Sequence, residues 1–426
     1  MENKNRILIL PVFIIIIVVI SGISFSSVFS YGKYYSENPK QNSTSKVIEK
    51  QQNSTLNTSE TKNSPANDIL NNKNLIIKGS YAYFGRGAKP KDPNFTVYLN
   101  PEVVGMQADF MWKDIETSEG VYNFSSLDDI INLSVSNGKK VKLIISTSGI
   151  AVPDWVKNLP SVKIVKFIDT NHYRSSFCKE YSMPVFWDAI YMQKKEDFIK
   201  ALGQKYSKNP NIVSVMVSFA SAYTGDWEVP HNVGDIKDCG VSVDYIKEWL
   251  DAGYTTEKMF NAGKQTMDAW AEAFPKQAAI LSIGATNQKL DGTAMNLAKM
   301  VSDYGYLKYP KRFYIQSSGL SLKTPFADDL AIKNANENQY WYIYKLLSLH
   351  SPQIGLEMAA AASNGKIDNC RQNNNVSPCP PFDVLMQSVR IGLSYRPTFI
   401  NFWQADAQNK DLEEVLKYAN SKIGKF

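Results

Sequence analysis

Residues 212–230, IVSVMVSFASAYTGDWEVP, combine residue types that acid–base chemistry and ring stacking require. The first half is an apolar, β-branched run of the length of a buried parallel strand. The second half supplies Tyr223, Asp226, Trp227 and Glu228. A carboxyl group can protonate a leaving oxygen and a flat indole can stack on a sugar ring, so the pattern is typical of a strand that ends in a carbohydrate site.

A second acid, Glu357, lies near the end of another apolar run, residues 353–358. Groups that act together in a parallel barrel sit at the C-terminal strand ends, however far apart they are in sequence. We therefore expect Glu357 to face Asp226 and Glu228 across the mouth of a barrel. Carboxyl groups separated by about 5 Å would fit a retaining mechanism, in which one is the nucleophile and the other is acid and then base.

The elements that must position these acids alternate along the chain from about Leu75: short apolar runs are followed by amphipathic segments, as in βα units. The expected strands are residues 103–110, 141–146, 162–168, 212–220, 278–283, 312–316, 353–358 and 398–403. The expected helices are residues 127–137, 153–158, 194–206, 257–274, 294–303, 338–349, 382–394 and 411–422. This alternation predicts an α/β fold, a (β/α)8 TIM barrel with enlarged loops. A doubly wound open sheet is the alternative, but no Gly-rich turn follows the first strand to hold a dinucleotide.

The N-terminal part of the chain differs from the rest in composition. Residues 1–32 carry Lys4 and Arg6 before a long uncharged run, which predicts a signal peptide or an uncleaved signal anchor. Residues 33–74 are rich in Asn, Ser and Thr and predict a flexible linker, and residues 75–426 are the predicted barrel. We expect an extracytoplasmic protein, either anchored to the membrane by its N-terminal segment or secreted.

N-x-S/T triplets are frequent, and they are either glycan acceptors of an exported protein or chance triplets of an Asn-rich chain. They begin at Asn42, Asn53, Asn57, Asn94, Asn123 and Asn132.

Charge and cysteine content narrow the partners. The formal charge of +6 is spread over segments of both signs, so nucleic acid is a poor candidate for the partner of this protein.

Four cysteines without a Cys-x-x-Cys pair favour disulfides in an exported chain, with free buried thiols as the alternative. We expect Cys370 to pair with Cys379, and Cys178 with Cys239, which would tie the loops after the third and fourth strands together. The histidines are too scattered for a zinc site, and we expect His231 to line the cleft; neither a metal nor an organic cofactor is expected.

Four features of the sequence resemble one known clan. Residues 112–128 read WKDIETSEGVYNFSSLD, similar to the W..iE...G.Y.F..lD segment of retaining (β/α)8-barrel β-glycosidases, which include β-galactosidase-like and cellulase-like enzymes. Trp155 stands in a P.W pattern that the clan shares, the acids end the fourth and seventh strands, and Trp403 falls where the clan commonly places a Trp beneath the sugar.

The resemblance implies Glu357 as nucleophile and Glu228 or Asp226 as acid/base. The clan's acid/base is usually a Glu preceded by Asn, whereas Gly225 precedes Asp226 here. Alignment therefore favours Asp226, and the longer reach of a Glu favours Glu228. Either acid could instead cap the following segment or pair with a lysine.

Aromatic and polar side chains near the strand ends are the candidate substrate contacts, although such residues are also common in protein cores. The candidates are Trp112, Trp155, Tyr223, Trp227, His231, Tyr314 and Trp403. Tyr314 and Gln316 either hydrogen-bond the nucleophile or fill the barrel, and Asp109 either points into the mouth or pairs with a neighbouring strand.

These residues together predict an extracytoplasmic glycoside hydrolase that cleaves a β-linked oligosaccharide or polysaccharide by a retaining mechanism. The alternative is a non-catalytic carbohydrate-binding protein of the cell surface on a degenerate barrel, which the missing Asn-Glu pair would support. A transglycosylase is a third hypothesis.

Overall fold

The computed structural model describes residues 77–84, 95–169, 177–222, 227, 239–240, 245–284, 297–337, 339, 341–364 and 380–425. In this part of the chain eight parallel strands pair in a closed ring, which confirms the predicted barrel. In chain order they are β1 (Gly79–Phe84), β2 (Gly105–Met111), β5 (Lys140–Ser146), β8 (Ile212–Met216), β9 (Ala278–Ser282), β10 (Phe313–Leu320), β11 (Ile354–Met358) and β12 (Phe399–Trp403). The ring closes because β1 pairs with β2 on one side and with β12 on the other.

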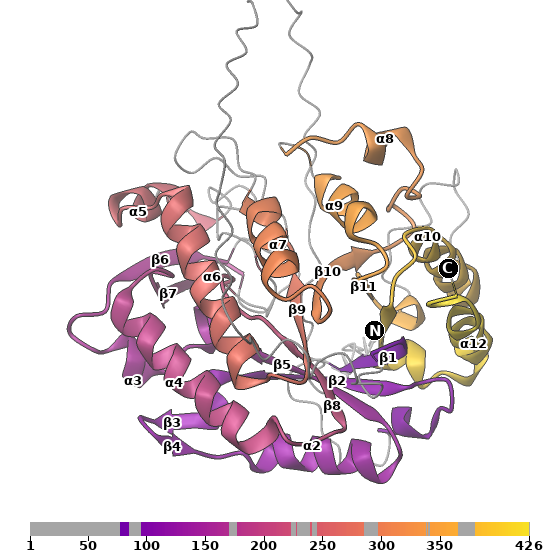
Figure 1. Cartoon of the computed structure of the whole chain (residues 1–426), viewed down its shortest axis with the longest axis horizontal. Helices are drawn as coiled ribbons and strands as arrows, with labels where there is room; N and C mark the ends of the chain where they lie inside the picture. Colours follow the sequence, from indigo (N-terminus) through magenta and orange to yellow (C-terminus); the bar gives the residue numbers. More distant parts are fainter. Residues whose placement is uncertain are drawn as a thin grey trace, which may run out of the picture.

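Helices cover the outside of the barrel (Figure 1). The longer ones are α2 (Ser125–Ser136), α4 (Ala189–Tyr206), α6 (Thr256–Ala273), α7 (Leu297–Lys308), α9 (Tyr342–His350), α10 (Pro381–Ser394) and α12 (Glu413–Lys422). The shorter ones are α1 (Trp112–Ile115), α3 (Asp154–Lys157), α5 (Tyr245–Asp251), α8 (Leu330–Lys333) and α11 (Gln404–Ala407), with 3-10 turns η2 (Val97–Leu99), η3 (Gly149–Ala151), η5 (Ala362–Asn364) and η7 (Lys410–Leu412). Asp188 caps α4 and Thr255 caps α6, because each side chain accepts a backbone N–H of the first turn. Each predicted helix overlaps one of the observed helices.

One predicted barrel strand is wrong. Residues 162–168 contain β6 (Ile164–Ile168), which pairs antiparallel with β7 (Glu180–Pro184) in a separate hairpin. The eighth place in the barrel belongs to β1, which the sequence analysis missed. In β6 exposed and buried residues alternate at the start, whereas β1 is buried at every position, as a barrel strand must be. A second small hairpin, β3 (Glu116–Ser118) with β4 (Val121–Tyr122), follows α1.

Two apolar layers fill the ends of the barrel interior. Phe399, the first residue of β12, belongs to the layer at the N-terminal end, and Trp403, the last residue of β12, belongs to the layer at the C-terminal end. The first layer is formed by Ile77, Tyr81, Val213, Ala278, Ile280 and Phe399, and the second by Tyr83, Ile144, Met216 and Trp403. Polar side chains lie between them, so the described interior has a polar layer enclosed by an apolar layer at each end.

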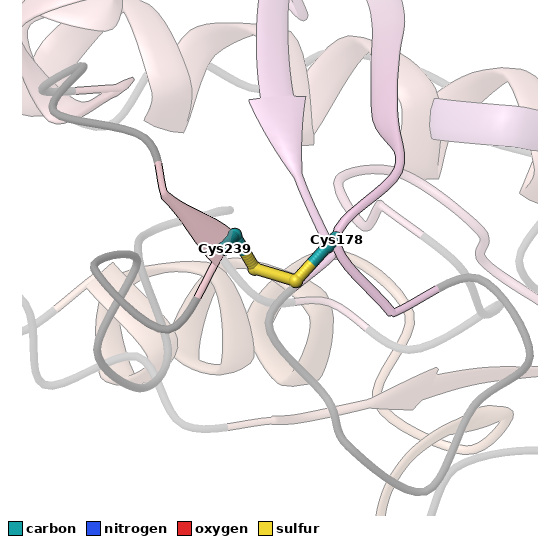
Figure 2. The surroundings of a disulfide bond; sticks show 2 residues. All are labelled: Cys178 and Cys239. Atoms are coloured by element: carbon teal, nitrogen blue, oxygen red, sulfur yellow. A yellow bond between two sulfur atoms is a disulfide. The ribbon is translucent and has the colours of Figure 1, made fainter.

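A disulfide joins Cys178 and Cys239, whose Cα atoms are 5.2 Å apart (Figure 2). Cys178 lies between β6 and β7, after the third barrel strand β5, and Cys239 lies between β8 and α5, after the fourth. The predicted link between these two excursions is therefore confirmed. The other predicted pair, Cys370 with Cys379, lies outside the described residues.

No helix in the described ranges is long and apolar enough to cross a membrane. The predicted signal segment, residues 1–32, and the predicted linker, residues 33–74, lie outside those ranges.

Candidate active site

Glu357 lies near the C-terminal end of β11, and its side chain points into the barrel. Its neighbours Leu356 and Met358 belong to the core between the strands and the helices, so alternation along the strand turns Glu357 inward. The residue is 8% exposed. A carboxyl group is thus held at the mouth end of the barrel, where the sequence placed it.

Three amide side chains converge on one oxygen of Glu357. Oε2 accepts from Gln107 Nε2 of β2 over 2.5 Å, from Asn401 Nδ2 of β12 over 3.1 Å and from Gln316 Nε2 of β10 over 3.5 Å. Hydrogen bonds from neutral donors favour the charged form of a carboxyl group and fix its rotamer. Glu357 is therefore an oriented carboxylate whose donors come from three other strands.

Lys142 of β5 lies below this layer of amides, on the side of the apolar bottom. Its Nζ donates to Asn401 Oδ1 over 2.8 Å, and it lies over the ring of Phe399, 3.4 Å from the centroid, and 5.0 Å from that of Tyr81. The side chain is 2% exposed. Burial lowers the pKa of Lys142 well below its usual value, and the negative charge of Glu357 opposes this by raising it.

The network allows one orientation of the Asn401 amide. The Nζ of a protonated lysine only donates, so beside an ammonium group Asn401 turns Oδ1 toward Lys142 and Nδ2 toward the acceptors. Nδ2 then reaches Gln107 Oε1 at 2.7 Å and Gln316 Oε1 at 3.1 Å as well as Glu357. Both glutamine amides can consequently present their NH2 groups to the carboxylate.

The mouth above Glu357 carries Trp403, Tyr83 and Asp109. The Trp403 ring meets Tyr83 edge to face with centroids 4.8 Å apart, and its Nε1 donates to the carbonyl of Met358 over 2.7 Å. Tyr83 in turn donates its hydroxyl to Asp109 Oδ2 over 3.3 Å. The predicted platform Trp403 is thus half-buried and fixed to the residue that follows Glu357, and Asp109 points into the mouth.

Two other predicted platforms lie elsewhere. Trp112 is fully buried: it stacks on Phe198 of α4, and its Nε1 donates to Glu116 Oε2 over 2.6 Å. Trp155 packs edge-on against Trp112 and donates to the Glu116 carbonyl over 3.3 Å. Glu116 also accepts the N–H of Gly120, and burial raises its pKa. Residues 112–128 therefore hold the outer core together, and both indoles pack against that core.

Trp227 is also a core residue. It is fully buried, its ring meets Phe219 edge to face at 5.2 Å, and it packs against Gly263 of α6. Its backbone, however, extends the sheet beyond β9, because its N–H donates to Ser282 and its carbonyl accepts from Gly284. Trp227 therefore gives no platform, but it places the chain at the rim of the barrel.

Tyr314 fills the bottom of the barrel rather than the mouth. It packs with Phe399 in the N-terminal layer, one inward position below Gln316, and Gln316 makes the contact with Glu357. Four predicted site residues lie outside the described part of the chain: Tyr223, Asp226, Glu228 and His231.

The described residues contain no group of three or more His, Cys, Asp and Glu side chains that could hold a metal ion.

Comparisons with known proteins agree with this architecture. Residues 98–280 match a family model described as Beta-galactosidase. The β-galactosidases LacZ and LacA of Lactobacillus acidophilus are 26% and 27% identical over 167 residues, 38% of this chain. That stretch is 22% of each relative, so the chain spans about a fifth of the curated relatives it matches.

One solved structure extends the likeness in fold to most of the barrel. The catalytic domain of a β-amylase from Paenibacillus polymyxa superposes with a TM-score of 0.50 at 9% identity, covering 81% of this chain and 97% of that domain. A β-galactosidase from Halorubrum lacusprofundi gives a TM-score of 0.49 at 12% identity, covering 82% of this chain and 58% of that one. The first likeness supports the fold, and the sequence match supports the relationship. In sequence over residues 98–280, and in fold over most of the barrel, the chain is similar to (β/α)8-barrel glycoside hydrolases.

Sequence reasoning missed three residues of this candidate site. Gln107, Lys142 and Asn401 are polar residues inside strands that are otherwise largely apolar, GMQADFM, KVKLIIS and FINFW. A polar residue in a strand that is buried on both faces needs partners inside the barrel, and this was the available signal. The family match ends before residue 357, so the role of Glu357 rests on geometry.

Proposed function

We propose that this protein is a retaining glycoside hydrolase that acts on a β-linked sugar, with Glu357 as its nucleophile. The observation that carries the proposal is the convergence of Gln107, Asn401 and Gln316 on Glu357 Oε2 at the mouth of the barrel. Three donors hold the carboxylate in one rotamer, and a fixed carboxylate is what in-line attack on an anomeric carbon requires.

In the first step the carboxylate of Glu357 attacks the anomeric carbon. The bond to the leaving oxygen breaks as a second acid protonates it, which gives a covalent glycosyl-enzyme. In the second step the same acid, now a base, takes a proton from water, the water attacks the anomeric carbon, and Glu357 leaves as a carboxylate.

The second acid is proposed to be Asp226 or Glu228. Both flank Trp227, whose backbone bonds to Ser282 and Gly284 at the rim of the barrel. The position of Trp227 at the rim, next to both acids in the sequence, supports this assignment.

A β-galactoside is the first substrate class to test, because the matching family model and the two curated relatives are described as β-galactosidases. Trp403 would supply the apolar face for the sugar ring, since its indole is anchored beside Glu357.

The decisive experiment is covalent trapping. Incubation with an activated 2-deoxy-2-fluoro-β-galactoside should label the protein once, and peptide mass spectrometry should find the label on Glu357. Glu357→Gln should take up no label and lose at least about three orders of magnitude in kcat on an aryl β-galactoside. Glu414→Gln, an exposed acid of α12, is the matched control and should behave as wild type. A label on another residue, or an active Glu357→Gln, would remove Glu357 from the reaction.

Azide rescue distinguishes the two candidate acids. Loss of the acid/base leaves a glycosyl-enzyme that azide can intercept, so the correct variant, Asp226→Ala or Glu228→Ala, should regain turnover with azide and release a β-glycosyl azide. Rescue of Glu357→Ala should give the α-azide instead, because azide then displaces the leaving group directly. Binding of β-galactosides without turnover by the wild type would favour a carbohydrate-binding protein.

We also propose that the catalytic barrel works outside the cytoplasm. The disulfide between Cys178 and Cys239 supports an oxidising compartment, and the apolar run within residues 1–32 supports export or anchoring. Fractionation of cells that produce the full chain, with protease accessibility of the barrel as readout, tests this. Protein confined to the cytosol would contradict it.

A further inference from the structure

Lys142 is a charged side chain inside the barrel that has no direct acidic partner within salt-bridge distance among the described contacts. It is 2% exposed and bonds to the side-chain oxygen of Asn401. A buried lysine is costly unless its surroundings compensate for lost hydration. Its position below Glu357, in the middle of the polar layer, calls for a function rather than a packing explanation.

The surroundings of the Lys142 Nζ suit an ammonium group. The contacts are an amide oxygen at 2.8 Å and the faces of Phe399 and Tyr81, with centroids at 3.4 and 5.0 Å. All three are electron-rich, and aromatic faces attract cations. A neutral amine would need a donor for its lone pair, whereas the nearest amide NH2 groups, those of Asn401 and Gln107, point at Glu357.

The bond from Lys142 also fixes the site's amide orientation. With Oδ1 of Asn401 held by the lysine, Nδ2 faces Glu357 Oε2 at 3.1 Å. Without the hydrogen bond from Lys142, the Asn401 amide could rotate by about 180° and place Oδ1 next to the carboxylate of Glu357. Two acceptor oxygens would then repel each other where a hydrogen bond now forms.

We propose that Lys142 is a positioning residue of the active site: it orients Asn401 toward Glu357 and, as a buried ammonium group one amide away, keeps the nucleophile ionised. This inference rests on the proposed role of Glu357, and it adds a residue from a fourth strand, β5, to the machinery. Lys142 does not reach the sugar, because the amide layer lies between them.

The other titratable groups that face this pair are few among the described residues. Tyr81 of β1 and Tyr314 of β10 lie at the bottom, and burial raises the pKa of both phenols, so both stay neutral. Tyr83 of β1 and Asp109 of β2 lie above, joined by a hydrogen bond. Asp109 is the only acid in this set besides Glu357. The variant Asp109→Asn therefore measures how much Asp109 contributes to the pKa of Glu357.

The test is direct titration of Glu357. Protein labelled with 13C at the glutamate side-chain carboxyl is titrated by NMR, with Glu357→Gln identifying the resonance. In Lys142→Met the pKa of Glu357 should rise by about one unit or more, as expected when an opposite charge at this range is removed. Lys195→Met removes a different buried lysine, in α4 and away from the site, and should leave that pKa unchanged.

Activity gives the second readout. The acidic limb of kcat/KM against pH should move to higher pH in Lys142→Met by the same amount, with kcat reduced more than KM is changed. Lys142→Gln keeps a hydrogen-bond donor but has no charge, so it should retain a higher kcat than Lys142→Met and show the same shift of the acidic limb. If Lys142→Met does not fold, Lys142→Gln is used for the test.

The outcomes separate the two proposals. An unchanged titration of Glu357 in both Lys142 variants would overturn this inference while leaving the nucleophile in place. An active Glu357→Gln would overturn the proposed function, and the NMR titration would still report whether Lys142 acts on Glu357.

Discussion

Lys195 offers a sharp test of the energetics of this barrel. It lies on α4 with no exposed surface, and its Nζ has no hydrogen-bond partner; its neighbours are the rings of Tyr191 and Phe219, with centroids 4.8 and 5.1 Å away. Burial lowers the pKa of Lys195 from 10.5 to about 7. The folded protein is therefore more stable when Lys195 is neutral than when it carries a proton.

The sign of the effect follows from proton linkage. Between the folded pKa of about 7 and the unfolded value of 10.5, the unfolded lysine carries a proton that the folded one lacks, so the free energy of unfolding rises with pH. Below pH 7 Lys195 is protonated in both the folded and the unfolded protein, and its full destabilising effect on the fold is present. Above pH 10.5 Lys195 is neutral in both states, and this effect is absent. At about 1.4 kcal/mol per pH unit, the side chain costs about 4 kcal/mol at pH 7 and about 2 kcal/mol at pH 9.

Lys195→Met replaces the amine with an apolar group of similar length. We expect it to raise the free energy of unfolding by about 4 kcal/mol at pH 7 and about 2 kcal/mol at pH 9. Urea unfolding followed by tryptophan fluorescence at the two pH values measures both. Lys200→Met, an exposed lysine of the same helix, is the control and should change stability by less than about 0.5 kcal/mol. A destabilised Lys195→Met, or a gain that does not shrink from pH 7 to pH 9, would refute the reasoning.

Three further predictions concern other parts of the molecule. Cys178→Ser with Cys239→Ser opens a link across a sequence separation of 61 residues and should lower the free energy of unfolding by about 4 kcal/mol, measured as the difference between oxidised protein and the double variant. Glu116→Ala leaves the Trp112 Nε1 and the Gly120 N–H without their acceptor and should cost about 3 kcal/mol in the same assay, with unchanged KM. Trp403→Ala should raise KM for a β-galactoside at least about tenfold because the ring is the proposed platform, and a KM equal to that of wild type would contradict this.

The barrel could be predicted from the sequence because its strands are apolar at both faces and its helices are amphipathic. The error at residues 162–168 arose because a hairpin strand and a barrel strand look alike over five residues, and only the pairing of β1 with both β2 and β12 shows which one closes the ring. Glu357 could be placed because it ends a strand.

The indoles could not be assigned in the same way. Trp112, Trp227 and Trp403 all lie near the C-terminal side of predicted strands, but a sequence does not show whether a ring turns toward the helices or toward the mouth. Gln107 and Asn401 were missed because they are 294 residues apart in the sequence and come into contact only when the barrel closes.

That separation has a consequence for how the protein matures. Gln107 comes from the second strand and Asn401 from the last, and both bind the same carboxylate oxygen. A chain that has made its first seven strands therefore owns the nucleophile but not its complete support. If Glu357 is the nucleophile, as we propose, refolding protein should regain full activity no earlier than β12 pairs with β11 and β1.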